Sequence, residues 1–433
     1  MIKSVFIILS ILILSSCSFD TKSGIWTKEK IALNDKENNQ IKELFKKEVL
    51  NENEFNPNLK LVIKNFSQNK NKYNGNNFGA FTVNSNFKEI LKYSYSKIEY
   101  FDQFEPEAVF IDKDLIFFDK RGSIIKFDHK SKIEWKVNYY TKKEKKLLPI
   151  LKFEKSGKNL LVTDNLAKIY LLNTSNGKLI WQKEHDVSLI SQLKIENNKF
   201  YVLDANNTFS CYSLLDGQKI WQFKAEKKLI NSQKQTSVVI NDDSVIFNNT
   251  KGEIISLNKI DGNLNWLTPT IEYGESLQSF LVKNSDLVLD ENNIYFSNNQ
   301  NSFFSLDTNL GFINWKQDIS SKLRPVIIDN IILTISLKGY LYILEKNSGK
   351  IIRITDIFYN VKSKNKKKLE INGFIVTRDK IYLSTNNGKI IKVNIENGNI
   401  DLVYRVSRSK ISKPYVNDSK IYVIKDNGII KIN

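Results

Sequence analysis

The segment Asp216-Gly217-Gln218-Lys219-Ile220-Trp221 places a tryptophan four residues after a glycine, and this spacing recurs along the chain. The same spacing occurs in three further segments: Asn176–Trp181, Asp261–Trp266 and Leu310–Trp315. A large aromatic residue at a fixed distance from a turn can pack between neighbouring β-sheets. The recurrence therefore indicates a chain built from repeated β-sheet units.

Degenerate copies extend the repeat in both directions. Trp135 has Ser131 where the glycine would stand, and Ser348–Arg353 and Asn397–Leu402 keep the glycine but lose the tryptophan. From position 135 the equivalent sites fall at 181, 221, 266, 315, 353 and 402, so the steps run from 38 to 49 residues. A period of about 45 residues fits one four-stranded propeller blade and exceeds that of an ankyrin or leucine-rich repeat.

The tryptophans are predicted to be structural residues between blades and not a stack around a cofactor, because large aromatic residues are usually well buried. The predicted inter-blade aromatic residues are Trp135, Trp181, Trp221, Trp266 and Trp315.

A pair of strands precedes each glycine turn. Lys380–Thr385 is predicted to be one strand and Lys389–Asn394 its partner, joined by the tight turn Asn386-Asn387-Gly388. Similar hairpins are predicted around positions 122, 167, 207, 252, 301, 339, 388 and 428. The last blade stops at Asn433 without an outer strand, and we predict that Asn86–Tyr93 supplies it, with Tyr93 42 residues before Trp135.

The predicted fold is therefore all-β: an eight-bladed β-propeller of four-stranded antiparallel blades over residues 81–433, with the ring closed by strands from the N- and C-terminal ends. Residues 17–80 are predicted to form a polar tether with a short helix at Gln40–Val49.

The first residues predict export. Lys3 precedes an apolar run, Val5–Leu14, that is too short to span a bilayer. Leu14-Ser15-Ser16-Cys17 then resembles the bacterial lipobox, which implies a signal peptide over residues 1–16 and acylation of Cys17 as a membrane anchor. The alternative is an ordinary buried cysteine in a cytosolic helix.

Composition narrows the function classes. Cys211 is the only other cysteine, so no intramolecular disulfide is expected, and the two histidines share no metal-ligand spacing with cysteine or acid. The net charge of +18 becomes +17 without Lys3. Two lysine clusters, within 142–146 and 362–368, are interpreted as solvated loops or as contacts to anionic lipid headgroups. They lack the interleaved aromatic residues that would stack nucleic-acid bases, so no nucleic-acid partner is predicted.

The segment Ser305–Trp315, with its Leu-Asp ending, glycine turn and tryptophan, resembles the pyrroloquinoline-quinone-type propeller repeat. Together with the lipobox and about eight blades, it makes the chain similar to the BamB family of outer-membrane assembly lipoproteins. The resemblance implies a non-catalytic scaffold, without cofactor, metal or catalytic residue, on the periplasmic side of the outer membrane of a Gram-negative bacterium. It also implies two kinds of partner, the barrel-inserting subunit of the assembly machinery and unfolded outer-membrane proteins.

The resemblance also implies a partner-binding surface on loops in the middle of the chain. Aligned by blades, these loops fall at Lys228–Asn231 and Leu281–Asp286, which makes Leu229, Ile230, Lys283 and Asp286 the candidate contacts. The alternative for Leu229 and Ile230 is the start of a buried inner strand.

Two other functions remain open. A quinoprotein dehydrogenase shares the blade repeat, although many such enzymes hold the quinone against adjacent cysteines, and Cys211 has no neighbouring cysteine. A general adhesion or ligand-binding propeller is the third class.

We expect Cys17→Ala to abolish acylation and to leave unprocessed or mislocalised protein, because no other residue near the start can accept the lipid. Metabolic labelling with a clickable palmitate analogue measures this directly, and label that persists on the variant would disprove the anchor.

Overall fold

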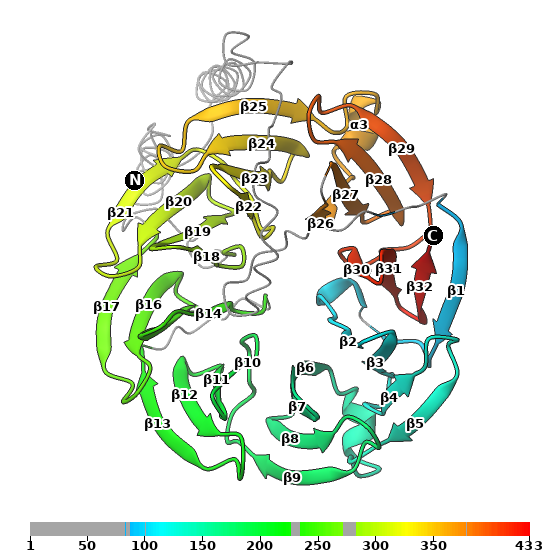
Figure 1. The fold of residues 1–433 in the computed structure, drawn as a ribbon, viewed down its shortest axis with the longest axis vertical. Coiled ribbons are helices and arrows are strands. Elements are labelled where there is room, and N and C mark those ends of the chain that lie inside the picture. The colour runs from blue at the N-terminus through cyan, green and yellow to red at the C-terminus, as the bar shows by residue number, and fades with distance from the viewer. Residues whose placement is uncertain (1–82, 84–86, 100, 227–233, 272–282, 378) are drawn as a thin grey trace, which may run out of the picture. The chain divides into compact units, whose positions relative to one another are not determined.

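The described part of the chain forms a ring of β-sheets. The computed structural model describes Val83 and residues 87–99, 101–226, 234–271, 283–377 and 379–433. Within them lie eight four-stranded antiparallel sheets arranged around a central axis (Figure 1). The prediction of an all-β, eight-bladed propeller is thus confirmed. Cys17 and the helix predicted at Gln40–Val49 lie outside the described residues.

Each blade is numbered along the chain and runs from an inner strand at the axis to an outer strand at the rim. The strands of blades 1 to 4 are β2 (Val109–Ile111), β3 (Asp114–Phe118), β4 (Ile124–Phe127), β5 (Ile133–Val137); β6 (Leu151–Ser156), β7 (Asn159–Asp164), β8 (Lys168–Asn173), β9 (Leu179–Glu184); β10 (Lys194–Glu196), β11 (Lys199–Leu203), β12 (Thr208–Ser213), β13 (Lys219–Lys224); β14 (Val238–Ile240), β15 (Ser244–Asn248), β16 (Glu253–Asn258) and β17 (Leu264–Pro269).

The other four blades follow the same order. Their strands are β18 (Val288–Asp290), β19 (Asn293–Asn298), β20 (Ser302–Asp307), β21 (Ile313–Gln317); β22 (Val326–Ile328), β23 (Ile331–Ile335), β24 (Tyr340–Glu345), β25 (Ile351–Asp356); β26 (Ile371–Val376), β27 (Lys380–Thr385), β28 (Lys389–Asn394), β29 (Ile400–Arg405); β30 (Tyr415–Asn417), β31 (Lys420–Lys425), β32 (Gly428–Ile432) and β1 (Glu89–Ser94). The helical turns in this region are η2 (Phe101–Gln103), η3 (Glu144–Leu147) and α3 (Ser363–Lys366).

Position within the blade explains the residue pattern of each strand. The second strand β15 is buried along its whole length, because a neighbouring blade covers each of its faces. The outer strand β13 alternates between exposed and more buried side chains, since only one of its faces meets protein. Middle strands are therefore buried almost throughout, and outer strands show a period of two.

The glycine-to-tryptophan spacing joins consecutive blades. Trp266 on β17 donates its indole Nε1 to the Thr308 carbonyl of the next blade, at 2.8 Å. Gly311 lies beneath the ring with a φ of 74°, and a Cβ there would come within 2.6 Å of the indole. The other indoles donate in the same way: Trp135 to Thr174, Trp181 to Leu214, Trp221 to Lys259 and Trp315 to Lys346. Only glycine fits this left-handed turn below an aromatic ring.

Arg353 occupies the next equivalent position. It is 1% exposed, and its Nη2 donates to the Ile395 carbonyl at 2.6 Å, three residues before Gly398, as the indoles do in earlier blades. Its Nε has no hydrogen-bond partner among the described residues, and burial lowers the pKa of its guanidinium to about 10. The arginine preserves the donor of the tryptophan and leaves one polar atom unsatisfied.

The last blade is closed by the first described strand, as the sequence predicts. β1 pairs antiparallel with β32, and the Lys88 amide donates to the Asn433 carbonyl at 3.1 Å. The register corrects one detail, because Leu91, which pairs with Lys431, and not Tyr93 stands where the other outer strands carry tryptophan. Tyr93 is fully buried, with its ring 5.7 Å from that of Phe127.

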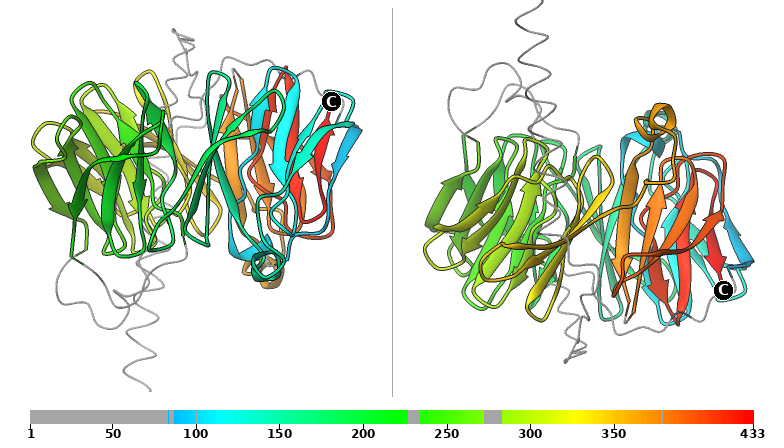
Figure 2. Two further views of the ribbon diagram at one scale, coloured as in Figure 1. Left: turned by 90° about the horizontal axis from the view of Figure 1, so that it is seen from below. Right: turned by 90° about the horizontal axis from the view of Figure 1, so that it is seen from above.

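Two faces of the ring follow from this topology. The glycine turns between third and outer strands, together with Asn433, lie on one face, here called the turn face. The connections from each outer strand to the next inner strand lie on the opposite face, here called the connection face. Figure 2 shows η3 and α3 projecting from the connection face and the C-terminus on the other side.

Deleting residues 86–95 should abolish cooperative thermal unfolding and promote aggregation, because the deletion removes Tyr93 from the core and exposes β32 as a sheet edge. Calorimetry and light scattering of the variant beside the full chain test this. A melting curve equal to that of the full chain would contradict closure by β1.

Candidate functional site at the propeller axis

Charged side chains from several blades meet at the axis, each at or just before an inner strand. Asp286 precedes β18, Arg324 precedes β22 and Lys413 precedes β30. Inner strands converge at the centre of the ring, so residues far apart in sequence become neighbours there (Figure 1). The result is a mixed cluster of acids and bases that no single segment of the sequence contains.

Asp286 and Arg324 form the tightest pair of this cluster. The carboxylate accepts from Arg324 Nε at 2.9 Å and from Nη2 at 2.5 Å, and both side chains are at most 16% exposed. Lys234 lies 3.9 Å from the same carboxylate and donates to the carbonyls of Asn284 and Lys322. Burial alone would raise the pKa of Asp286, but the charges of Arg324 and Lys234 hold this pKa well below its usual range.

Lys413 and Glu107 form a second axial pair, at 2.9 Å. Burial acts against both charges, yet their mutual attraction keeps the pKa of Lys413 above and that of Glu107 below the usual value. The hydroxyl of Tyr415 donates to the Pro106 carbonyl at 2.9 Å and fixes the strand beside this pair. All four side chains are therefore charged at neutral pH, and within each pair the positive charge balances the negative one.

Lys152, on the inner strand β6, is held by backbone carbonyls and not by a carboxylate. Its Nζ donates to the carbonyls of Leu189 and Ser191 at 3.0 and 3.3 Å, and burial lowers the pKa of the amine to about 8. Burial also lowers the pKa of Lys194, which lies nearby on β10. Carbonyl dipoles can hold an ammonium group at this depth but compensate its lost hydration only in part.

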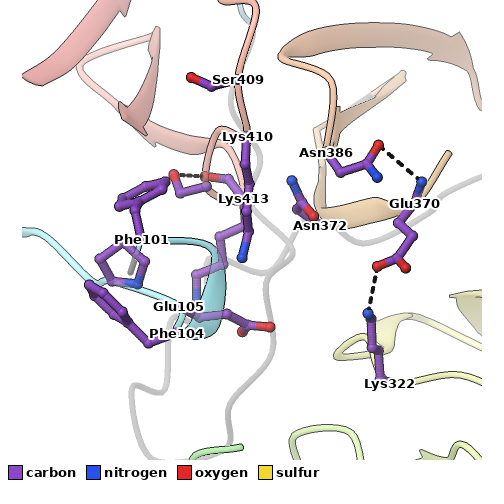
Figure 3. A pocket seen from close by; sticks show the side chains of 12 residues that line it. Phe101, Phe104, Glu105, Lys322, Glu370, Asn372, Asn386, Ser409, Lys410 and Lys413 are labelled. Atoms are coloured by element: carbon purple, nitrogen blue, oxygen red, sulfur yellow. Dashed lines mark hydrogen bonds and ion pairs between the residues drawn. The ribbon is translucent and has the colours of Figure 1, made fainter. Parts of the chain in front are cut away.

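A cavity of about 490 Å³ opens beside the axial cluster, between blades 1, 6, 7 and 8. Figure 3 shows the rings of Phe101 and Phe104 on one side, Lys410 and Lys413 above them, and the Lys322–Glu370 pair across the cavity. A volume of this size is within the range of small-ligand sites. Three of its charged groups, Lys322, Glu370 and Lys413, are held in ion pairs, which favours the binding of polar groups over acid–base catalysis.

The structure separates the residues that the sequence grouped as partner contacts. Lys283 is exposed on the connection face, and its amide donates to Asn299 Oδ1 at 2.7 Å. Asp286, three residues later, points into the axial cluster and is paired with Arg324. Leu229 and Ile230 lie outside the described residues.

Asn284, next to Lys283, is a further candidate that sequence analysis did not identify. It is 6% exposed, yet neither atom of its side-chain amide hydrogen-bonds within the described structure. The Thr236 hydroxyl is likewise without a partner there, and both residues line a small polar cavity of about 20 Å³ with Lys234 and Lys283. Such a cavity holds one water molecule, or the polar end of a group bound from outside.

A sequence signal for the axial charges does exist. Ser285 precedes Asp286, and Ser412 precedes Lys413, in both cases just before an inner strand. Each serine hydroxyl accepts an amide of the second strand at 2.9 Å, from Ser297 and from Ile424 respectively. A serine followed by a charge at this point of the repeat therefore marks a side chain directed towards the axis.

The described residues contain no group of three or more His, Cys, Asp or Glu side chains placed to hold a metal ion. Cys211 is buried, and burial raises the pKa of its thiol to about 12, which makes it a poor nucleophile. No helix in the described part of the chain is long and apolar enough to cross a membrane.

The fold and the repeat define the class: an eight-bladed propeller of the pyrroloquinoline-quinone-type repeat. A family model described as outer membrane protein assembly factor BamB matches residues 120–355, and the chain belongs to that family. It is 21% identical over 262 residues to the outer membrane protein assembly factor BamB of Yersinia pestis. That alignment covers 56% of this chain and 63% of the Yersinia protein, less than two thirds of its length.

Solved structures share the fold. BamB from Moraxella catarrhalis superposes with a TM-score of 0.63 at 13% identity, over 79% of this chain and all of that one. A europium-containing methanol dehydrogenase superposes with a TM-score of 0.66 at 10% identity, over 86% of this chain and 90% of that one. Identities this low establish the propeller architecture and no shared activity.

Asp286→Asn should destabilise the protein by about 2 kcal/mol at pH 7, because it leaves Arg324 nearly buried without its counter-charge. The depressed pKa of Asp286 means that its contribution is complete above about pH 4 and is lost as the pH falls below that value. Denaturant titrations at pH 7 and pH 3 should therefore show a smaller difference between variant and wild type at pH 3. The double variant Asp286→Leu, Arg324→Met is the control and should lose less stability; equal losses would contradict the pairing.

Proposed function

We propose that the protein is a non-catalytic scaffold of the outer-membrane β-barrel assembly machinery, which binds the barrel-inserting subunit and assists insertion of outer-membrane proteins. The observation that carries this proposal is the match of the BamB family model over residues 120–355. The axial chemistry agrees, because the carboxylates of Asp286 and Glu107 are held in ion pairs with Arg324 and Lys413. Cys211, on β12 of blade 3, has a thiol whose pKa burial raises to about 12.

The proposed location is the periplasmic face of the outer membrane, with the chain anchored by lipid on Cys17 after removal of residues 1–16. The lipobox-like segment Leu14–Cys17 and the family relationship support this location.

The proposed docking surface is on the connection face at blades 3 to 5. Lys283 is exposed there, and Asn284 offers a donor and an acceptor without partners among the described residues. Such an amide can bind the backbone of an incoming peptide, while Leu229 and Ile230 would supply apolar contacts. We do not assign Asp286 to the contact itself, because a partner would first have to displace Arg324 from its carboxylate. Its proposed role is to hold the end of the loop that carries Lys283 and Asn284.

A quinoprotein dehydrogenase is the second candidate, because enzymes of that class share the blade repeat. Against it stands the axial residue set, in which Asp286 and Glu107 are already paired with Arg324 and Lys413. A divalent cation would have to compete with these buried pairs for the same carboxylates. Quinone-dependent alcohol oxidation by the wild type would establish this function in place of the scaffold.

Replacing Leu229 and Ile230 together by aspartate should lower affinity for the barrel-inserting subunit at least about tenfold, since two charges in an apolar contact are costly to desolvate. Titration calorimetry with the periplasmic part of that subunit measures the effect, and circular dichroism should show an unchanged melt.

The matched control is Leu215→Asp with Ile260→Asp, two exposed apolar residues on the turn face. This control should bind normally. Unaltered binding by the folded Leu229, Ile230 variant would overturn the proposed surface, and unfolding of that variant would place the two residues in the core.

A further inference from the structure

Two lysine-rich loops on the connection face are built alike. The first joins β5 to β6 and is held at its base by Tyr140, which is buried against Gly122 of the same blade. The second joins β25 to β26 and is held by Phe358, buried against Gly339. In each loop a buried aromatic residue on a hairpin glycine fixes the base, so the tip projects from the ring at a defined place (Figure 2).

The tip of the first loop is basic and apolar. Lys142, Lys143 and Lys146 are exposed, and Leu147 at the end of η3 is 61% exposed. Glu144, the only acid between 141 and 148, is bound by the Thr141 amide at 2.8 Å and by Lys168 at 2.5 Å. The single counter-charge of the tip is thus directed towards the ring and away from the exposed lysines.

The second tip repeats this composition without related sequence. Residues 361–369 contain five lysines and no acid, and Lys362, Lys364, Lys367 and Lys368 are exposed. Tyr359, which precedes them, is 66% exposed. The flanking acids are already paired, Asp356 with Lys366 and Glu370 with Lys322.

We propose that these two tips form a docking surface for an anionic lipid bilayer, with the lysines at the headgroups and Leu147 and Tyr359 in the interface. Clustered lysines are attracted to anionic headgroups, and an adjacent aromatic or aliphatic side chain adds burial at the boundary of the acyl chains. The two tips are on well-separated parts of one face, after blades 1 and 6. A flat bilayer can contact both tips at once, whereas a compact partner protein would reach both less readily.

The turn face does not offer the same chemistry. Its exposed apolar tips on blades 3 and 4, Leu215 and Ile260, lie beside Asp216 and Asp261. Carboxylates at the tips would be repelled by anionic headgroups. The inference is also separate from the proposed partner surface, which is on blades 3 to 5, whereas the lysine tips follow blades 1 and 6.

Lysine footprinting of the full chain tests the proposal without altering the protein. The chain is bound to vesicles of phosphatidylcholine with or without phosphatidylglycerol, acetylated briefly and analysed by mass spectrometry. Lys142, Lys143, Lys362 and Lys367 should be protected severalfold on anionic vesicles only, and high salt should remove the protection. Exposed lysines of the turn face serve as the internal control and should stay reactive: Lys178, Lys219 and Lys350.

Equal reactivity of both faces on anionic vesicles, or protection on neutral vesicles as well, would overturn the proposal. Protection by soluble polyglutamate but not by vesicles would instead assign the tips to an acidic protein. In co-sedimentation, Lys142→Gln, Lys143→Gln and Lys146→Gln together should weaken binding to anionic vesicles at least about tenfold, since each lysine near the surface contributes about a fivefold factor. The same change at Lys178, Lys219 and Lys350 should have no such effect, and equal losses for the two sets would contradict the assignment to the connection face.

Discussion

The contact between an outer-strand indole and the glycine turn of the next blade is the interaction on which the ring depends. It combines burial of an aromatic ring, worth about 1.5–3 kcal/mol, with a directed hydrogen bond from Nε1 to a turn carbonyl. Because each indole reaches forward to the following blade, the contact adds a directed hydrogen bond to the apolar packing between consecutive sheets. The closed ring then removes free edges, which open sheets would expose to aggregation.

This interaction also explains how far the sequence could predict the fold. The glycine and the tryptophan are only four residues apart in the sequence, so the period of the repeat can be found from the sequence alone. The blade number follows in the same way from the eight predicted hairpins. Register is less local. The sequence predicted Tyr93, 42 residues before Trp135, at the position that the tryptophans occupy in other outer strands, whereas the pairing of β1 with β32 puts Leu91 at that position. A strand with no preceding glycine turn carries no spacing from which its register could be read.

The axial cluster shows the opposite case. Asp286, Arg324, Lys413 and Glu107 come from blades 5, 6, 8 and 1, and nothing in the local sequence of any one of them indicates its partner. Only closure of the ring brings them together. Once there, each charge is so poorly hydrated that it requires an opposite charge, and the resulting pairs specify which blades meet at the centre more than they stabilise the fold. The same pairing makes the axis a poor place for a catalytic base.

The distribution of charge over the surface then constrains how the molecule meets its surroundings. The described chain enters the ring at Phe87 and Lys88 on the turn face, beside Asn433, whereas the lysine tips and Lys283 are on the connection face. Seventy residues separate Cys17 from Phe87, a contour of roughly 230 Å when fully extended. The anchor that we propose on Cys17 would hold the propeller near a membrane without deciding which face turns towards it. That choice falls to the folded surface, where the tips with Leu147 and Tyr359 match an anionic bilayer. The turn-face tips of blades 3 and 4, which carry Asp216 and Asp261, do not.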